Sequence, residues 1–162
     1  MARRILGVGL ILGSMSVAAL AAPAAQAAPA VQSTTCNVDM LLLFRPGLTF
    51  TTQHQMIRAR GNLTGCAGGG VTSGSILPTS SGSGDMSCTS GSASATVNVR
   101  WNTGQLSQAS VTVDTSGNVN GTVTRGLFMG EPVTASLTVT PLNGDCLFTP
   151  VTKAEATGSV SL

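Results

Sequence analysis

Apolar and polar residues alternate along most of the chain from Cys36 onward, and this period of two constrains the fold more than any other feature. In one such segment Val133, Ala135, Leu137 and Val139 alternate with Thr and Ser residues. Successive side chains of a β-strand point to opposite faces, so this segment has one apolar and one hydroxylated face. The pattern predicts a half-buried strand.

The same alternation, interrupted by turn sequences, predicts further strands. They are expected near residues 36–44, 55–64, 71–76, 94–101, 106–114, 118–125, 132–140 and 154–162. Turn sequences such as Asn120-Gly121 supply the positive φ angles that tight hairpins need. No segment after residue 35 shows a helical period of any length. The sequence therefore predicts an all-β fold, an antiparallel β-sandwich or barrel of seven or eight strands.

The N-terminal sequence has the three parts of a secretory signal peptide. Arg3 and Arg4 precede an apolar run over residues 5–20, and Ala25-Gln26-Ala27 matches a small-residue cleavage site. Glycine and serine interrupt the run, which makes it too short for a membrane anchor. We expect a cleaved helical signal peptide over residues 1–27. The protein is then secreted, and is extracellular or associated with the cell wall.

Cleavage would leave a flexible N-terminal segment (28–35) and a single β domain (36–162), with no membrane span. Without Arg3 and Arg4, six basic residues face six acidic ones, so the remaining chain is formally neutral. Neutrality argues against a nucleic-acid or anionic-membrane partner, because such surfaces are bound through clustered Lys and Arg. Arg58 and Arg60 share one face of a predicted strand, which we interpret as a solvated outer face.

The four cysteines lie in the predicted exported part: Cys36, Cys66, Cys88 and Cys146. An oxidising exterior allows disulfides to persist, and four cysteines allow three pairings. We favour Cys36 with Cys66 and Cys88 with Cys146, because each pair would tie the ends of neighbouring β segments. No two cysteines are two to four residues apart, so we expect no metal or other cofactor.

Sequence motifs of common enzymes are missing. The chain has neither a G-x-S-x-G nor an H-E-x-x-H run, and its single histidine, His54, stands in the polar segment 51–55. We interpret His54 as structural. The protein is predicted not to be an enzyme.

Four segments depart from simple alternation. Residues 65–70 and 78–91 are rich in Gly and Ser, and we expect both to be surface connections. The run 40–44 is apolar at both parities, which predicts a central strand covered on both faces. Leu127-Phe128-Met129 is bounded by glycines and is interpreted as a core-filling strand end, with an exposed contact patch as the alternative.

Several short sequences resemble those of small secreted four-cysteine β proteins of actinobacteria. They include Gly61-Asn62-Leu63-Thr64-Gly65-Cys66, Val99-Arg100-Trp101-Asn102-Thr103-Gly104 and Gly126-Leu127-Phe128-Met129-Gly130. The resemblance spans nearly all of the chain after the signal peptide. It implies an exported β architecture, and it implies no activity or functional residue.

These features favour a secreted non-enzymatic β-sandwich module that binds a protein partner or a cell-envelope component. One route is pairing of a free edge strand, for which the terminal run 154–162 is the candidate. A second hypothesis is a hydrolase inhibitor presenting residues 84–91 around Cys88. A third is a carrier of a small apolar metabolite, with Trp101, Phe128 and Met129 around a cavity. These three side chains form the candidate binding surface.

Overall fold

The computed structural model describes residues 33–162, so the predicted signal peptide (1–27) and residues 28–32 lie outside the described residues. The described chain forms eight strands: β1 (Thr35–Leu48), β2 (Gln53–Ala67), β3 (Gly74–Met86), β4 (Gly91–Trp101), β5 (Leu106–Asp114), β6 (Asn118–Gly126), β7 (Pro132–Pro141) and β8 (Val151–Ser161). The all-β prediction is confirmed for this part of the chain, and each predicted strand has a counterpart.

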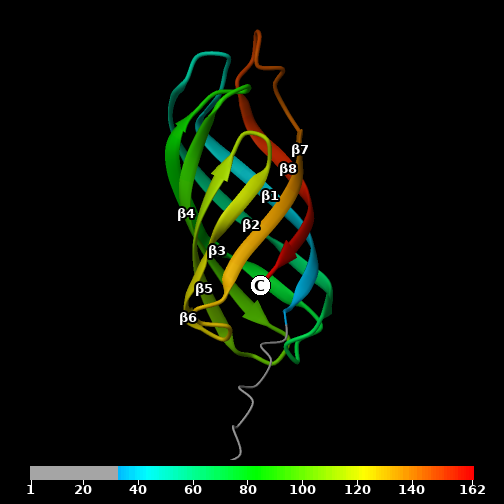
Figure 1. Ribbon diagram of the computed structural model, residues 1–162. Coiled ribbons are helices and arrows are strands. Elements are labelled where there is room, and N and C mark those ends of the chain that lie inside the picture. The colour runs from blue at the N-terminus through cyan, green and yellow to red at the C-terminus, as the bar shows by residue number, and fades with distance from the viewer. Residues whose placement is uncertain (1–32) are drawn as a thin grey trace, which may run out of the picture. The chain divides into compact units, whose positions relative to one another are not determined.

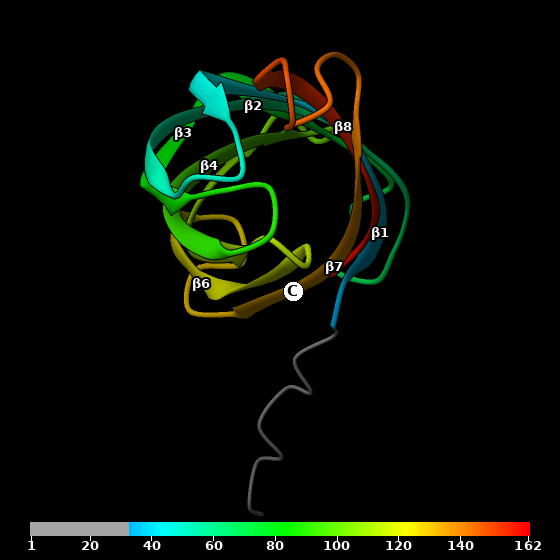
Figure 2. The same cartoon turned by 90° about the horizontal axis from the view of Figure 1, so that it is seen from above.

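The eight strands form a closed antiparallel barrel in sequence order (Figures 1 and 2). Each strand pairs with the next, and β8 closes the ring by pairing with β1 from Thr35 opposite Ser161 onward. Backbone hydrogen bonds between Thr34 and Leu162 extend this ladder by one further residue. Of the two predicted architectures the barrel is therefore observed and the sandwich is not.

The terminal strand has no free edge. β8 pairs with β1 on one side and with β7 on the other, where Thr134 faces Ser161 and Pro141 faces Ala154. The prediction that 154–162 is an edge strand is wrong. Alternation identifies a strand and its two faces, but it does not identify the neighbours of that strand.

Strand β3 is longer than predicted. The segment 78–91, expected as a surface connection, supplies the second half of β3 and a tight turn. Its small residues fit a close approach of backbones: a Cβ at Gly82 would lie 2.5 Å from the carbonyl oxygen of Ser94. The expected loop 65–70 likewise begins inside β2. In 78–86 the low hydrophobicity therefore reflects close packing of neighbouring strands and an exposed outer wall, not a loop.

The two faces of the barrel wall differ in polarity. Inward-facing apolar side chains include Val38, Leu63, Val99, Val111, Val123, Val133, Leu137 and Ala156. In the run 40–44, Met40, Leu42 and Phe44 face inward, whereas Leu41 and Leu43 lie half-buried on the outer wall. The prediction that both faces of this run are covered is wrong, because nothing in the described chain packs on the outer wall of β1. Residues 33–162 contain no helix with the length and hydropathy needed to cross a membrane.

Both predicted disulfides are present. Cys36–Cys66 joins β1 to β2, and Cys88–Cys146 joins the β3–β4 turn to the β7–β8 hairpin. The hairpin is the loop at the top of Figure 1. The first bridge thus lies at the lower end of the barrel and the second at the upper end. Two disulfides are consistent with an oxidising extracellular environment.

Candidate functional site

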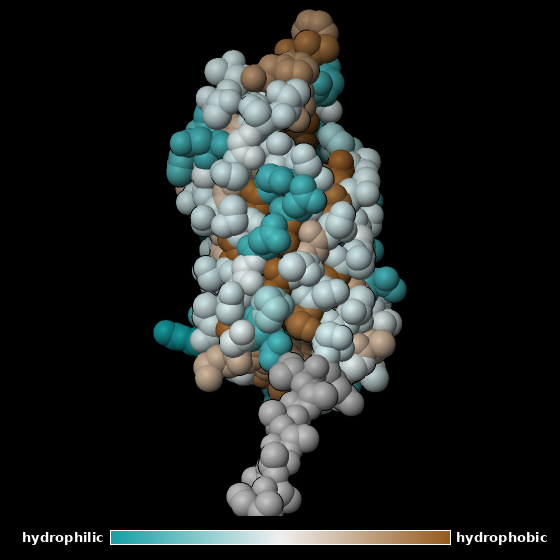
Figure 3. Space-filling model, in the orientation of Figure 1, coloured by the Kyte–Doolittle hydropathy of each residue, from teal (hydrophilic) through white to brown (hydrophobic). Residues whose placement is uncertain are grey.

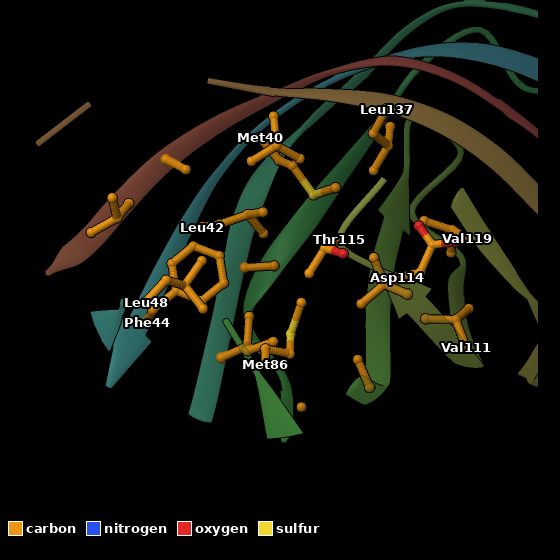
Figure 4. A pocket seen from close by; sticks show the side chains of 18 of the residues that line it. Met40, Leu42, Phe44, Leu48, Met86, Val111, Asp114, Thr115, Val119 and Leu137 are labelled. Atoms are coloured by element: carbon orange, nitrogen blue, oxygen red, sulfur yellow. The ribbon is translucent and has the colours of Figure 1, made fainter. Parts of the chain in front are cut away.

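The barrel interior is incompletely filled. A cavity of about 210 Å³ occupies its upper half, lined mainly by apolar side chains such as Met40, Leu42, Phe44 and Met86 (Figure 4). A second cavity of about 100 Å³ lies deeper, beside Trp101. Eight strands form a barrel whose interior is either just filled by side chains or able to hold one small ligand. The free volume shows that side chains do not fill this interior completely.

The two cavities share a wall. Six side chains line both of them: Met40, Ala59, Val97, Val111, Val119 and Leu137. The cavities therefore lie next to each other in the interior, on either side of these six side chains, and together make up its unfilled space. We call this space the lumen.

The buried polar side chains along the lumen are bonded to other protein groups. Ser80 Oγ accepts the backbone N–H of Asn98 at 2.9 Å. Ser87 Oγ accepts the N–H of Ser90 at 3.0 Å. Ser107 Oγ accepts the indole N–H of Trp101 at 2.8 Å. Because these groups already have partners, the lumen offers its contents an apolar surface rather than hydrogen bonds.

Polar groups appear where the lumen reaches the upper end of the barrel. Asp114 and Thr115, at the β5–β6 turn, border the larger cavity (Figure 4). Asp114 accepts the side-chain N–H of Asn118 at 3.0 Å and the backbone N–H groups of Ser116 and Asn118, each at 2.9 Å. These bonds, led by that from the Asn118 side chain, lower the pKa of the Asp114 carboxyl below its ordinary value of 3.8. The carboxylate thus holds the turn that forms one side of the mouth.

The other side of the mouth is formed by the second disulfide and its surroundings. Cys88, Pro141, Cys146 and Val151 all border the larger cavity. The bridge ties the β3–β4 turn to the β7–β8 hairpin across the mouth. We call this end of the barrel, with turns 49–52, 87–90, 115–117 and 142–150, the open end.

The opposite end is filled by aromatic side chains. Trp101 is buried, and the ring of Phe128 meets it edge-on, with centroids 5.3 Å apart and planes at 84°. Phe128 adopts a left-handed backbone conformation (φ 67°), which aims its ring at Trp101. Val71 and Leu127 complete this cluster. We call this the closed end.

The three side chains of the candidate binding surface separate in the structure. Trp101 lines the deeper cavity, and Phe128 packs against Trp101. Met129 is 69% exposed and points away from the lumen. The segment 127–129 therefore contributes two side chains to the closed end and one to the solvent-exposed surface.

Other candidates lie outside the lumen. His54 Nδ1 is 3.2 Å from Asp85 Oδ1 on the outer wall, where both side chains are exposed. Within residues 33–162, no three His, Cys, Asp or Glu side chains are grouped to hold a metal ion. Around Cys88, Met86 and Ser87 are buried, so most of the segment 84–91 does not project as a loop.

Sequence reasoning missed the mouth of the lumen. The inward-facing residues are recognisable by their parity, but the sequence predicted a cavity only as a third hypothesis, around Trp101, Phe128 and Met129. A signal existed for Asp114, since Asp114-Thr115-Ser116-Gly117-Asn118 has the composition of a turn in which the aspartate accepts backbone N–H groups. Its position beside a cavity depends on closure of the barrel.

Comparison with known proteins adds no assignment to this geometry. No family model matches the chain, no curated protein matches it, and no solved structure matches it.

Proposed function

We propose that this protein is a secreted, non-enzymatic carrier that holds a small apolar molecule in the lumen of its barrel. The observation that carries the proposal is a pair of neighbouring apolar cavities whose buried polar side chains are bonded to other protein groups. The cavities of about 210 and 100 Å³ together reach the lower end of the range of about 300–1,000 Å³ typical of ligand pockets.

The lining defines the class of ligand. A polar atom carried past the mouth would lose its hydrogen bonds to water and find no free partner, which is unfavourable. The buried part of the ligand is therefore hydrocarbon. Its polar end, where it has one, stays beside Thr115, whose half-buried side chain lies at the mouth.

The side chains between the two cavities limit the shape of the ligand. Val97, Leu137 and the small Ala59 line both cavities, and we propose that they form a constriction of the lumen. A slender chain then fits between them better than a broad fused-ring system. The proposed ligand is a single alkyl or isoprenoid chain lying along the lumen.

A paired substitution tests the proposal. Val97→Phe adds an aromatic ring at the constriction, whereas Ser94→Phe adds the same ring on the outer wall of the same strand. The fluorescence of N-phenyl-1-naphthylamine, an apolar dye, should rise on binding to the wild-type protein and to Ser94→Phe. Val97→Phe should reduce dye affinity about tenfold or more, the loss that 1.4 kcal/mol of steric cost produces. Equal dye binding by all three proteins would contradict a lumen site.

A second candidate function is binding of a cell-envelope component on the outer wall. A shallow groove there is lined by hydroxyl side chains, by Met56 and by the cations Arg45 and Arg58. Among the described residues neither arginine forms an ion pair. The double substitution Arg45→Ala with Arg58→Ala should then release the protein from isolated cell walls and leave dye binding unchanged. Retention on cell walls by this variant would count against the outer groove.

A further inference from the structure

The β7–β8 hairpin carries the most exposed apolar side chains of the described chain. We call residues 142–150 the tip hairpin. Leu142 is 54% exposed, Leu147 is 70% exposed and Phe148 is 89% exposed. The hairpin projects beyond the ends of the neighbouring strands, and its surface is strongly apolar (Figures 1 and 3). Phe50, in the β1–β2 turn at the same end, is 52% exposed.

Polar groups hold these side chains in place. Asp145 Oδ1 accepts the backbone N–H groups of Leu147, Phe148 and Thr149 at 3.1, 2.8 and 2.9 Å. The next residue, Cys146, is fixed by the disulfide to Cys88. The exposure of Leu147 and Phe148 is therefore built into a braced turn.

A second set of bonds fixes the base of the hairpin. Asn143 Oδ1 accepts the backbone N–H groups of Thr152 and Lys153 at 3.2 and 2.7 Å. The backbone N–H of Leu142 is bonded to the carbonyl of Lys153 at 2.9 Å. The orientation of the tip relative to β7 and β8 is thereby set. Large apolar side chains braced in water mark a surface that transfers to an apolar environment.

The tip adjoins the mouth of the lumen. Pro141 and Cys146, on either side of the first turn of the hairpin, both border the larger cavity. Whatever the tip contacts therefore lies next to the opening through which the ligand of the proposed function passes. A molecule whose buried part is hydrocarbon partitions out of water into lipid assemblies, so such an assembly is its source.

The size and charge of the tip favour lipid over a protein partner. A stable protein–protein interface buries about 800 Å² on each side, more than three side chains supply. Residues 142–150 contain no Lys or Arg, and their one carboxylate, Asp145, is bonded to backbone N–H groups. The tip thus has no charge suited to anionic headgroups, which agrees with the formal neutrality of the chain after residue 27.

We propose that the tip hairpin inserts into the surface of a lipid bilayer and brings the mouth of the lumen against it. This inference rests on the proposed carrier function, because it explains how a hydrocarbon ligand enters the lumen. Phe148 and Leu147 supply the contact, and Asp145 keeps them exposed. Insertion depends on apolar area, so it does not require anionic lipid.

Sedimentation with phosphatidylcholine vesicles tests the inference. The wild-type protein should pellet with the vesicles, and the double substitution Leu147→Ser with Phe148→Ser should lower the partition coefficient about tenfold or more. Met129→Ser is the matched control, because Met129 is 69% exposed at the closed end. It should partition like the wild type. Added phosphatidylglycerol or raised salt should leave partitioning unchanged.

The outcomes separate this inference from the carrier proposal. The tip variant should bind N-phenyl-1-naphthylamine in vesicle-free buffer as the wild type does, since none of its changes lines the lumen. Failure of the wild-type protein to pellet, or equal pelleting of wild type and tip variant, would overturn lipid insertion. A tip-dependent dimer in vesicle-free buffer would also overturn it, by assigning the tip to a second copy. Tip-dependent pelleting without dye binding by any variant would overturn the carrier proposal instead.

Discussion

The two ends of the barrel are built from the same alternating strands, yet one is filled and the other is not. At the closed end the indole of Trp101 is buried, bonded to Ser107 and covered by Phe128. At the open end the interior meets a mouth bordered by Asp114 and by the Cys88–Cys146 bridge. Apolar packing and the Cys36–Cys66 bridge stabilise the closed end, whereas hydrogen-bonded turns and the Cys88–Cys146 bridge stabilise the open end.

Local strain at each end matches this division. The two non-glycine residues with positive φ in the described chain are Phe128 (φ 67°) and Cys146 (φ 66°). Such a conformation costs about 1–2 kcal/mol, so surrounding interactions must hold it. Phe128 is held by packing on Trp101, and Cys146 by its disulfide to Cys88. The two ends are thus held by different interactions, and we expect the Cys88–Cys146 bridge to limit the width of the mouth.

The largest effect is expected from removing the Trp101 side chain, which fills the closed end. Trp101→Ala should destabilise the protein by about 3–5 kcal/mol, because it leaves a large cavity and removes the N–H that Ser107 Oγ accepts. Met86→Ala, near the mouth, should cost about 2 kcal/mol, because it removes a smaller side chain that borders the larger cavity. Urea unfolding followed by circular dichroism measures both. Equal costs would mean that the two ends are packed alike.

Removing either disulfide should lower the free energy of unfolding by a similar amount, whereas only removal of Cys88–Cys146 should change dye release. In the chain-entropy description, bridges that close 30 and 58 residues contribute about 3.5–4.5 kcal/mol each. The double variants Cys36→Ser/Cys66→Ser and Cys88→Ser/Cys146→Ser should therefore lose similar stability in urea. The second should also release N-phenyl-1-naphthylamine faster, because the mouth is no longer tied. Similar dye release from both variants would show that the bridge does not control the mouth.

A smaller effect is expected from removing the Ser107 hydroxyl at the closed end. Ser107→Ala removes the acceptor of the Trp101 indole N–H, which stays buried, and the donor to the Leu127 carbonyl, and it should cost about 1–3 kcal/mol. Ser87→Ala, which removes a hydroxyl from the turn at the open end, is the comparison. Ser107→Ala should also shift the emission of Trp101, and Ser87→Ala should not. Unchanged emission in Ser107→Ala would contradict the indole hydrogen bond.

The smallest effect is a loosening of the open end in acid. Backbone hydrogen bonds, first from Thr149 and then from Phe148, lower the pKa of the Asp145 carboxyl below its ordinary value of 3.8, and Asp114 is shifted the same way. Because the folded-state pKa lies below the ordinary value, the stabilisation is complete above that value and is lost as the pH falls through the folded-state pKa.

Amide hydrogen exchange measures this change. Exchange at 115–118 and 147–149 should accelerate in acid, after allowance for the intrinsic pH dependence of exchange. Exchange in β4 beside Trp101 should not change at the same pH. Simultaneous loss of protection at both ends would contradict separate stabilisation of the mouth.

Some features of the two ends could be predicted from the sequence and others could not. Period-two alternation predicted the strands. The expectation that each disulfide ties the ends of neighbouring β segments predicted Cys36–Cys66 and Cys88–Cys146. The prediction of a free edge at 154–162 was wrong because pairing between the first and last strands is a long-range contact that local alternation does not encode. The prediction that 78–91 is a surface connection was wrong because a strand built of small residues, which let neighbouring backbones approach, has the composition of a loop.

The sequence allowed a cavity near Trp101 as one of three hypotheses, but the extent of the lumen and its mouth could not be predicted from it. Val97 and Leu137 have the parity of core residues, and nothing local distinguishes a core side chain from one that borders free volume. That distinction depends on the diameter of the closed ring, and hence on how all eight strands pair. The tip was missed for another reason: Leu147 and Phe148 lie in a turn, where exposure depends on the bonds to Asp145.

We propose that the lumen holds a hydrocarbon chain above Trp101, and the single tryptophan of the protein allows a direct measurement. A conjugated polyene fatty acid absorbs where tryptophan emits, so its binding in the lumen should quench Trp101 by energy transfer. We predict saturable quenching at one fatty acid per chain, retained in Ser94→Phe and lost in Val97→Phe. Quenching that does not saturate, or that survives Val97→Phe undiminished, would contradict the claim.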